Sequence, residues 1–228
     1  MKFLIWDMDG TLIDSKKDIL LSLRTAFDIL RIDTSTQSKE LIIGPPLREA
    51  LLQAFPKNFL SNTDIEKILS VFRHIYDTCE YPNTHLYEQI DTIVKNTEFY
   101  THYIVTNKSD VASNRIIKKL GLTDFIKQVI TPYTFPNKLR SKSEIFKYLI
   151  ETENLVKNHT YGIGDMYTDY LAGQSAGIQT IGVLWGNGTR EELIAGIKRA
   201  IERKRAFEEE AQKEFADMRR RAAAQKEA

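Results

Sequence analysis

Short apolar runs alternate with longer amphipathic stretches along this chain, and the two patterns predict different elements. The runs are continuous, which indicates strands that are buried on both faces. They are Phe3 to Trp6, Tyr103 to Val105, Val129 to Ile130, Tyr161 to Ile163 and Thr180 to Val183. Strands of this kind with helices between them predict an α/β fold, in which a parallel sheet carries helices on both faces.

The long segment between the first and second runs carries only helical patterns. Ile19, Leu23 and Phe27 lie on one helical face, and two more helices are expected in "PLREALLQAF" and "DIEKILSVFRHIYDTC". We therefore expect an inserted all-helical cap domain over residues 14–82, with hinges at "LIDS" and "YPNTH". The core would then comprise residues 1–13 and 83–195.

The end of the chain changes composition after Arg190. Residues 198–228 hold ten basic and seven acidic side chains and few large apolar ones. This predicts one long, solvated, charged helix over residues 196–228. Its purpose stays open between an oligomerisation element that would give a homo-oligomer, an appended segment and a redesigned terminus.

The composition of the chain limits the classes of partner that it can bind. With 32 basic and 31 acidic residues the net charge is +1, so no global field attracts nucleic acid or anionic lipid. The single cysteine, Cys79, has no partner for an intramolecular disulfide. No apolar run reaches the roughly 18 residues of a membrane helix, and the N-terminus lacks a signal-sequence pattern. We expect a cytoplasmic protein with neither a nucleic-acid nor a membrane partner.

Two acidic residues directly follow the first strand, in "FLIWDMDGTL". Asp7 and Asp9 alternate with Met8, so an extended backbone sends both carboxylates to the same side. An acidic turn would explain an isolated Asp-x-Asp, but the longer Asp-x-Asp-Gly-Thr is much rarer by chance. Because two close carboxylates resist double ionisation, we expect a hard divalent cation, most simply Mg²⁺, to bind here.

Polar residues also follow the second and fourth strands. Thr106 and Asn107 end "YIVTN", where a strand meets a helix whose free N–H groups favour an anion, although such pairs are often simple helix caps. Asp165 and Asp169 lie in "IGDMYTD", four residues apart, so the second can face back to the first. Ligands bind at the carboxyl ends of strands in open parallel sheets, so these groups are expected to meet.

A phosphate at this edge needs a fixed positive charge besides the metal. The stretch "FPNKLRSKSEIFKYLI" offers three cations before a helix. Lys142 is our first choice because it begins the helix, and Lys138 is the reserve.

With these motifs the chain resembles the haloacid dehalogenase-like (HAD) hydrolase superfamily, specifically its phosphoglycolate phosphatase-like members. The resemblance lies in "DMDGTL", "VTN", "RSKSE" and "IGDMYTD", in that order, with "IGPPLREAL" in the insert and "AGIQTIGVLWGNGTREEL" near the end. It implies a Rossmann-like core with a helical cap inserted after the first strand. The chain departs from the family after "EEL", where a short strand and a closing helix usually follow.

The resemblance also implies catalytic roles. Asp7 would be the nucleophile that forms an aspartyl-phosphate, and Asp9 would protonate the leaving oxygen and then activate water. The metal would be held by Asp7, the backbone carbonyl of Asp9 and Asp165, with Asp169 holding the metal's shell in place.

The phosphate would be held by Thr106, Asn107 and Lys142. In the cap, Arg48 would meet an anionic tail of the substrate, unless it is only a surface arginine at a helix start. An acid at position 9 favours ester hydrolysis over dehalogenation, because an alkoxide needs a proton and a halide does not.

The sequence thus predicts a Mg²⁺-dependent phosphatase for a small phosphorylated metabolite, with phosphoglycolate first. Two alternatives remain: a phosphosugar mutase of the same superfamily and a non-catalytic scaffold. The intact set of acidic residues argues against the scaffold.

Overall fold

A five-stranded parallel sheet forms the centre of this computed structural model, which describes residues 1–135, 139–202, 205 and 209. All four strand pairs are parallel, and Ile5 lies opposite Tyr103 on one side and Gly162 on the other. The next two strands of this sheet in the chain lie on one side of β1, and the last two lie on its other side. The carboxyl end of β1 is therefore the topological switch point of the sheet, where ligands bind in folds of this kind. In spatial order the strands are β5 (Ile126–Ile130), β4 (Tyr100–Val105), β1 (Lys2–Trp6), β6 (Thr160–Gly164) and β7 (Gln179–Gly182).

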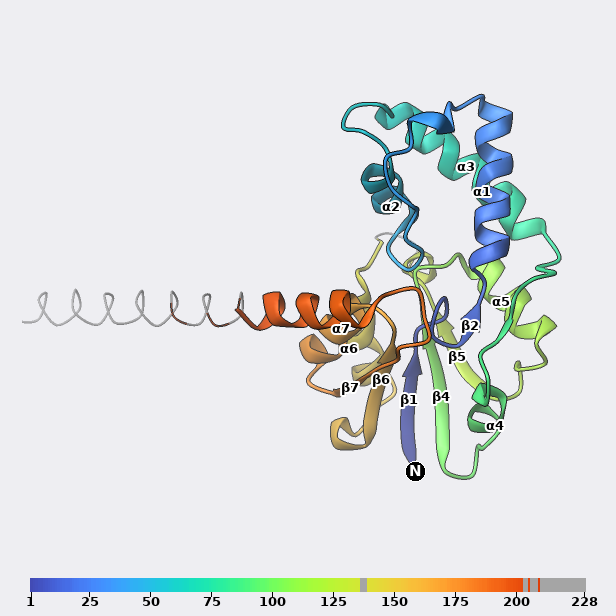
Figure 1. Ribbon diagram of the computed structural model, residues 1–228. Helices are drawn as coiled ribbons and strands as arrows, with labels where there is room; N and C mark the ends of the chain where they lie inside the picture. The colour runs from blue at the N-terminus through green and yellow to red at the C-terminus, as the bar shows by residue number, and fades with distance from the viewer. Residues whose placement is uncertain (136–138, 203–204, 206–208, 210–228) are drawn as a thin grey trace, which may run out of the picture.

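Helices cover both faces of this sheet (Figure 1). Trp6 belongs to a buried cluster with apolar residues of α4 and α5, whereas its neighbour Ile5 belongs to a second cluster with residues of α6 and α7. Successive residues of a strand point to opposite faces, which explains this division. The predicted α/β fold is confirmed. These helices are α4 (Ile90–Val94), α5 (Asp110–Lys119), α6 (Lys142–Thr152) and α7 (Tyr167–Ala176).

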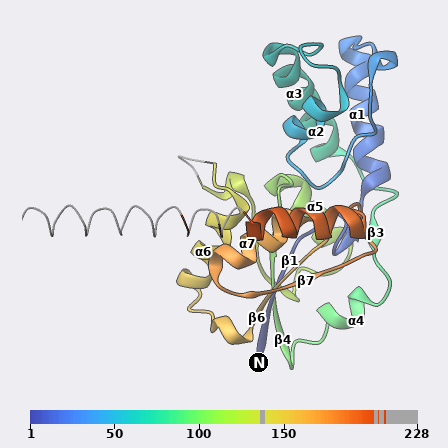
Figure 2. The same cartoon turned by 60° about the vertical axis from the view of Figure 1, so that its left-hand side comes forward.

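Three helices form a cap above the carboxyl edge of the sheet (Figures 1 and 2). Their apolar faces meet in a cluster of their own, which includes Leu23, Leu51 and Ile65. All three lie between β1 and β4 in the chain, so the expected all-helical cap is present as an insert. The division at residues 14 and 82 stays a prediction. The cap helices are α1 (Lys16–Leu30), α2 (Leu47–Ala54) and α3 (Asn62–Thr78), with a 3₁₀ turn at Thr34–Thr36.

A short antiparallel ribbon joins the cap to the core. It pairs β2 (Ile13–Asp14) with β3 (His85–Leu86), so both connections to the cap pass through one place. Asp18, at the base of α1, is buried and accepts hydrogen bonds from the backbone and side-chain amides of Asn83 and from the hydroxyl of Thr84, at 2.7–3.3 Å. These bonds tie α1 to the segment that returns to the core.

The strands begin earlier than the apolar runs predict. β4 starts at Tyr100 instead of Tyr103, because the polar residue His102 is buried in the sheet and accepts a hydrogen bond from Trp6 Nε1 at 3.0 Å. Burial lowers the pKa of His102 to about 4, so the ring is neutral and acceptable in the core. Hydropathy alone does not reveal such a paired polar residue.

The chain continues after β7 through a loop into a helix that begins at residue 190. Leu193 is buried, and a side chain at Gly196 would come within 2.4 Å of Tyr167, so the start of this helix packs on the core. Of the predicted charged helix over 196–228, only residues 196–202, 205 and 209 are described, and these are helical. Among the described helices, none is long and apolar enough to cross a membrane.

Candidate active site

Three buried carboxylates meet at the carboxyl edge of the sheet. Asp7 directly follows β1, Asp165 directly follows β6, and Asp169 lies in the first turn of α7. A carboxylate oxygen from each lies within 4.8 Å of the others. The backbone N–H of Asp7 donates to the carbonyl of Ile163 at 2.8 Å, which holds the ends of β1 and β6 side by side. The structure thus brings together the acidic residues that follow the first and fourth predicted strands.

Lys142 joins this cluster from α6. Its Nζ lies 2.7 Å from Asp7 Oδ1 and 2.5 Å from Asp169 Oδ1, and its side chain is only 10% exposed. Ser141 caps the helix and exchanges hydrogen bonds with Glu144, so α6 begins at Lys142. The amine is therefore fixed between two carboxylates, whereas the reserve choice, Lys138, lies outside the described residues.

Burial dominates the electrostatics of the cluster. Burial, and then the neighbouring Asp169 and Asp165, raise the pKa of Asp7 well above its usual value, although Lys142 opposes this. Burial likewise raises the pKa of Asp165. Burial alone would lower the pKa of Lys142, but Asp169 and Asp7 more than compensate and raise it. One ammonium is thus surrounded by more acidic groups than it can neutralise.

The donor atoms of this cluster suit a hard divalent cation. All three are carboxylate oxygens, the ligands that Mg²⁺ and Ca²⁺ prefer, and a cation would offset the burial and the repulsion that raise the pKa values. Asp165 is held by the hydroxyl of Thr11 at 3.1 Å and the backbone N–H of Asn187 at 2.7 Å. Gly10 has φ +84°, and a Cβ there would lie 2.3 Å from Asp165, so only glycine lets the loop pass this close.

Asp9 points into a different environment. Its carboxylate accepts hydrogen bonds from the hydroxyl of Ser15 and from Lys108 Nζ, the latter at 2.9 Å. Within the described residues, the carboxylate group that fits a metal comprises Asp7, Asp165 and Asp169, so the Asp9 side chain is not a member. The predicted ligation through the Asp9 backbone carbonyl stays a prediction.

Lys108 was not singled out from the sequence. Its side chain is only 3% exposed, and besides Asp9 it contacts Tyr76 of the cap, donating to the hydroxyl at 2.7 Å with Nζ 4.4 Å from the ring centre. In the sequence, a lysine directly after "VTN" has the pattern of a surface residue at the start of a helix. Its burial depends on Tyr76, which comes from a cap helix that is distant in the sequence.

The two predicted phosphate residues of β4 lie at its carboxyl end. Thr106 is buried, and its Oγ1 accepts a hydrogen bond from the backbone N–H of Lys108 at 3.2 Å. Asn107 reaches toward the cap, where its side-chain amide donates to the carbonyl of Gly44 at 3.2 Å. Their contact with phosphate stays a prediction.

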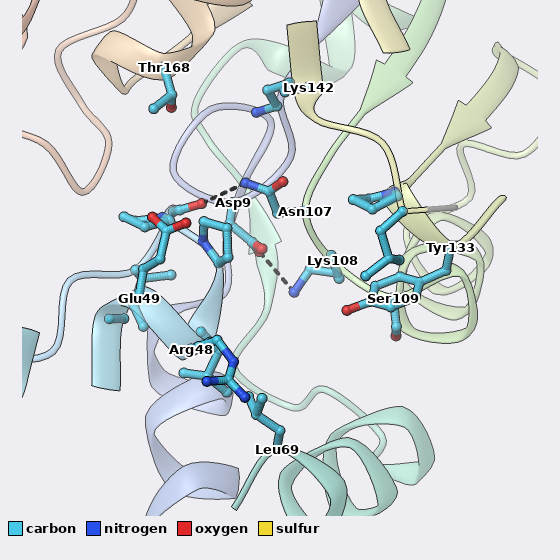
Figure 3. A pocket seen from close by; sticks show the side chains of 18 of the residues that line it. Asp9, Arg48, Glu49, Leu69, Asn107, Lys108, Ser109, Tyr133, Lys142 and Thr168 are labelled. Atoms are coloured by element: carbon cyan, nitrogen blue, oxygen red, sulfur yellow. Dashed lines mark hydrogen bonds and ion pairs between the residues drawn. The ribbon is translucent and has the colours of Figure 1, made fainter. Parts of the chain in front are cut away.

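A pocket of about 540 Å³ lies between the cap and the core beside this cluster. Figure 3 shows Asp9, Asn107, Lys108 and Lys142 at its core side and Arg48 with Leu69 at its cap side. Arg48 forms an ion pair with Glu66 and a 3.4 Å hydrogen bond with Asn62, so its charge is already paired within the cap. Its contact with an anionic substrate stays a prediction.

A family model described as haloacid dehalogenase-like hydrolase matches residues 4–183. The chain belongs to this family. The match spans β1, the cap and the sheet through β7, so the family assignment covers both the acidic cluster and the pocket. The predicted superfamily is confirmed.

The relatives of this hydrolase carry phosphatase names. A 5′-nucleotidase from Pseudomonas aeruginosa is 28% identical over 84% of this chain and 86% of its own length. A phosphoglycolate phosphatase from Aquifex aeolicus is also 28% identical, over 82% and 86%. A haloacid dehalogenase-like hydrolase structure from Bacteroides fragilis, 19% identical, superposes with a TM-score of 0.73 over 85% of this chain and 92% of its own. The predicted enzyme class, a phosphatase of this family, is confirmed.

Proposed function

We propose that the chain is a Mg²⁺-dependent phosphatase that hydrolyses a small phosphorylated metabolite through an aspartyl-phosphate on Asp7. The observation that carries this proposal is the position of Lys142 Nζ, which lies between Asp7 and Asp169 beside a third carboxylate. A covalent phosphoryl acceptor needs a carboxylate oxygen that can attack phosphorus and positive charge on both sides of the transferring group. Lysine would supply one charge and a metal the other.

In the first step, an oxygen of Asp7 attacks phosphorus and the bond to the ester oxygen breaks. Asp9 would give a proton to that leaving oxygen, which departs as the alcohol. Asp9 lines the pocket where the alcohol lies. Lys142 stabilises the negative charge of the phosphoryl group while it is transferred.

In the second step, Asp9 takes a proton from water, and the water oxygen attacks phosphorus. The bond between phosphorus and Asp7 breaks, which releases inorganic phosphate and restores both carboxyl groups. Thr106 and Asn107 would hold the phosphoryl oxygens at the end of β4. Bound Mg²⁺ would be held by Asp7, Asp165 and the carbonyl of Asp9, with Asp169 supporting it, and would supply positive charge to the phosphoryl oxygens.

Asp7→Asn tests the nucleophile. The change keeps the shape of the side chain but removes the charge that attacks, so we expect phosphate release to fall by at least about 10³-fold. Acid quenching during turnover of the wild type, followed by mass spectrometry, should find one phosphoryl group on the peptide that contains Asp7. A variant with near-normal turnover, or a phosphoryl group on another residue, would disprove this mechanism.

The metal has a test that does not depend on activity. Mg²⁺ should raise the Tm of the wild type but raise the Tm of Asp165→Asn much less, because a ligand that binds only the folded state stabilises it. Equal shifts in the two proteins would exclude Asp165 as a ligand.

Two of the names that the relatives carry, phosphoglycolate phosphatase and 5′-nucleotidase, suggest two alcohol parts, glycolate and a nucleoside. Phosphoglycolate is the first candidate from the resemblance of the cap. The mutase alternative is separated by incubation with a hexose 1-phosphate, which a mutase converts to an isomeric phosphosugar and a phosphatase converts to free sugar and phosphate.

A further inference from the structure

The carboxylate of Asp9 is held at one of its two oxygens. The hydroxyl of Ser15 and Nζ of Lys108 both reach Oδ1, with Lys108 at 2.9 Å, and no described residue donates a hydrogen bond to Oδ2. The Asp9 side chain is 13% exposed and lines the pocket between cap and core. One oxygen therefore fixes the orientation of the carboxylate, and the other is available to a group bound in the pocket.

Lys108 is itself held firmly in place. Its second contact is Tyr76, whose hydroxyl accepts a hydrogen bond from Nζ at 2.7 Å and whose ring centre lies 4.4 Å from Nζ. Tyr76 is 2% exposed and packs against the rings of Phe72 and Tyr81, with ring centres 5.3 Å and 5.2 Å away. An ammonium confined between a carboxylate, a hydroxyl and a buried ring has little freedom to move.

The two partners of Lys108 come from different parts of the chain. Lys108 follows β4 in the core, as Asp9 follows β1, whereas Tyr76 lies in the cap helix α3. The next residues pair in the same way, because the hydroxyl of Ser109 donates to the carboxylate of Asp77. Two consecutive core residues thus bond two consecutive cap residues, and Lys108 is the one that also contacts Asp9.

Other roles explain this geometry less well. A lysine that only joined cap and core would not need a carboxylate of the candidate active site, and burying its charge for that purpose would be costly. A lysine that bound the substrate would have to direct its charge into the pocket, whereas Lys108 directs it at Asp9. Burial raises the pKa of Tyr76 above its usual value, so this hydroxyl stays neutral and does not compete for that charge.

We propose that Lys108 is a positioning residue that, together with Tyr76, holds Oδ1 of Asp9 and so directs Oδ2 at the ester oxygen and then at the attacking water. This rests on the phosphatase function proposed above and adds two residues to it. Proton transfer needs heavy atoms within about 2.6–3.2 Å, and a displacement of about 1 Å can cost about 10²-fold in rate. Because Tyr76 belongs to the cap, Asp9 is held in this way when the cap is docked.

The first experiment separates proton transfer from phosphoryl transfer with two matched esters. p-Nitrophenolate leaves without a proton more easily than phenolate, which resembles a tyrosine side chain with a pKa of about 10. In single turnovers of Lys108→Met with Mg²⁺, transfer to Asp7 should slow at least about tenfold for phenyl phosphate and less than about threefold for p-nitrophenyl phosphate. Equal losses on both esters, or a raised KM with an unchanged kcat, would overturn the proposal.

The second step has its own signature. Attack of water needs Asp9 whichever ester is used, so Lys108→Met should accumulate more phosphoryl-Asp7 than the wild type during turnover of p-nitrophenyl phosphate. Acid quenching followed by mass spectrometry measures this fraction. A fraction equal to or below that of the wild type would contradict the proposed role.

Arg115→Ala is the matched control for contact between cap and core. Its guanidinium, from α5, donates to the carbonyls of Thr78 and Cys79 at the end of α3, at 3.5 Å and 3.1 Å, and has no contact with Asp9. This variant should keep both single-turnover rates within about threefold of the wild type. Losses like those of Lys108→Met would show that cap docking in general, and not the position of Asp9, is responsible.

Two further variants test whether Lys108 acts through Asp9. When Asp9 is already Asn, adding Lys108→Met should slow phosphate release by less than about threefold, because the group that the lysine positions is gone. A further loss as large as that in the wild-type background would overturn the proposal. Tyr76→Phe keeps the ring and should change both esters in the same direction as Lys108→Met by a smaller factor, which preserves the test if Lys108→Met does not fold.

Urea unfolding separates failure of this inference from failure of the phosphatase function. The midpoint shifts of Lys108→Met and Tyr76→Phe should be non-additive in the double variant, because the two side chains contact each other. Additive shifts, with normal phosphate release by the wild type, would overturn the contact with the cap and leave the phosphatase function intact. If the wild type releases no phosphate from any ester, the phosphatase function fails, and the role of Lys108 fails with it.

Discussion

The two sides of the cleft are built in opposite ways. On the core side, Asp7, Asp169 and Lys142 are nearly excluded from solvent, and Lys142 contacts both carboxylates directly. On the cap side, Arg48 and Glu66 form an ion pair whose side chains are 38% and 66% exposed, among apolar residues that face solvent. Charge is concentrated where a phosphoryl group would be transferred, and apolar surface lies where the alcohol part would lie.

This difference has an energetic meaning. A buried charge that loses its partner costs several kcal/mol, whereas an exposed ion pair contributes at most about 1 kcal/mol. Substitutions on the core side should therefore affect both stability and turnover, and substitutions on the cap side should change selectivity with little loss of stability. The predictions below test this contrast.

Lys142→Met should have the largest effect. It removes the charge between Asp7 and Asp169, and we expect kcat/KM to fall by about 10²–10³-fold, as when one donor to a transition-state oxyanion is lost. In metal-free protein, the unfolding free energy should also fall by about 3 kcal/mol or more, because buried carboxylates lose their partner.

Lys147→Met is the matched control for Lys142→Met. Lys147 lies on the same helix with an exposed side chain, so its substitution should leave the rate and the urea midpoint nearly unchanged. Similar losses in the two variants would show that the helix, and not the charge at the carboxylates, is what matters.

Asp18→Ala tests the connection between the two sides. The variant leaves the buried hydroxyl of Thr84 and the amides of Asn83 without their acceptor, and we expect a loss of about 3 kcal/mol in urea unfolding. Asp28→Ala, an exposed change on the same helix, should cost little. If the two cost the same, the bonds at the base of α1 do not hold the cap.

The pH dependence of stability should reveal the buried carboxylates. The pKa of Asp7 is raised in the folded protein, so between its ordinary value of 3.8 and the raised value the folded state retains a proton that the unfolded state has lost. Stability of the metal-free wild type should therefore fall with rising pH across this window, relative to Asp7→Asn, by about 1.4 kcal/mol per pH unit. Above the raised pKa, the difference should become constant.

Mg²⁺ provides the control for this pH experiment. A bound cation favours the ionised carboxylates, so saturating Mg²⁺ should reduce the difference in slope between the wild type and Asp7→Asn. Parallel stability profiles in the absence of metal would contradict the raised pKa.

The sequence could predict the core side far better than the cap side. Asp7, Asp165 and Lys142 lie next to the ends of strands or at the start of a helix, and the order of elements in a parallel sheet brings such positions together. Lys108 could not be recognised, because its contact with Tyr76 depends on how the cap docks. The same holds for Arg48, whose pairing with Glu66 depends on the packing of α2 against α3.

The early start of β4 escaped prediction for a related reason. His102 looks unsuited to a buried strand until Trp6 is placed opposite it as a hydrogen-bond donor. Local periodicity contains no information about a partner from a distant strand. Where function or packing depends on such pairs, the order of elements can be predicted from sequence but the individual contacts cannot.

Arg48→Ala should have the smallest effect and is the most direct check on the cap side. The ion pair with Glu66 is largely solvated, so the unfolding free energy should change by less than about 1 kcal/mol. Because the guanidinium is engaged within the cap, kcat/KM for phosphoglycolate should change by less than about threefold, whereas a direct contact between the arginine and a substrate carboxylate would typically be worth more than tenfold. A selective loss on phosphoglycolate, with an ester that lacks a carboxylate, p-nitrophenyl phosphate, unaffected, would return Arg48 to the role of an anion receptor and place charge recognition on the cap as well as on the core.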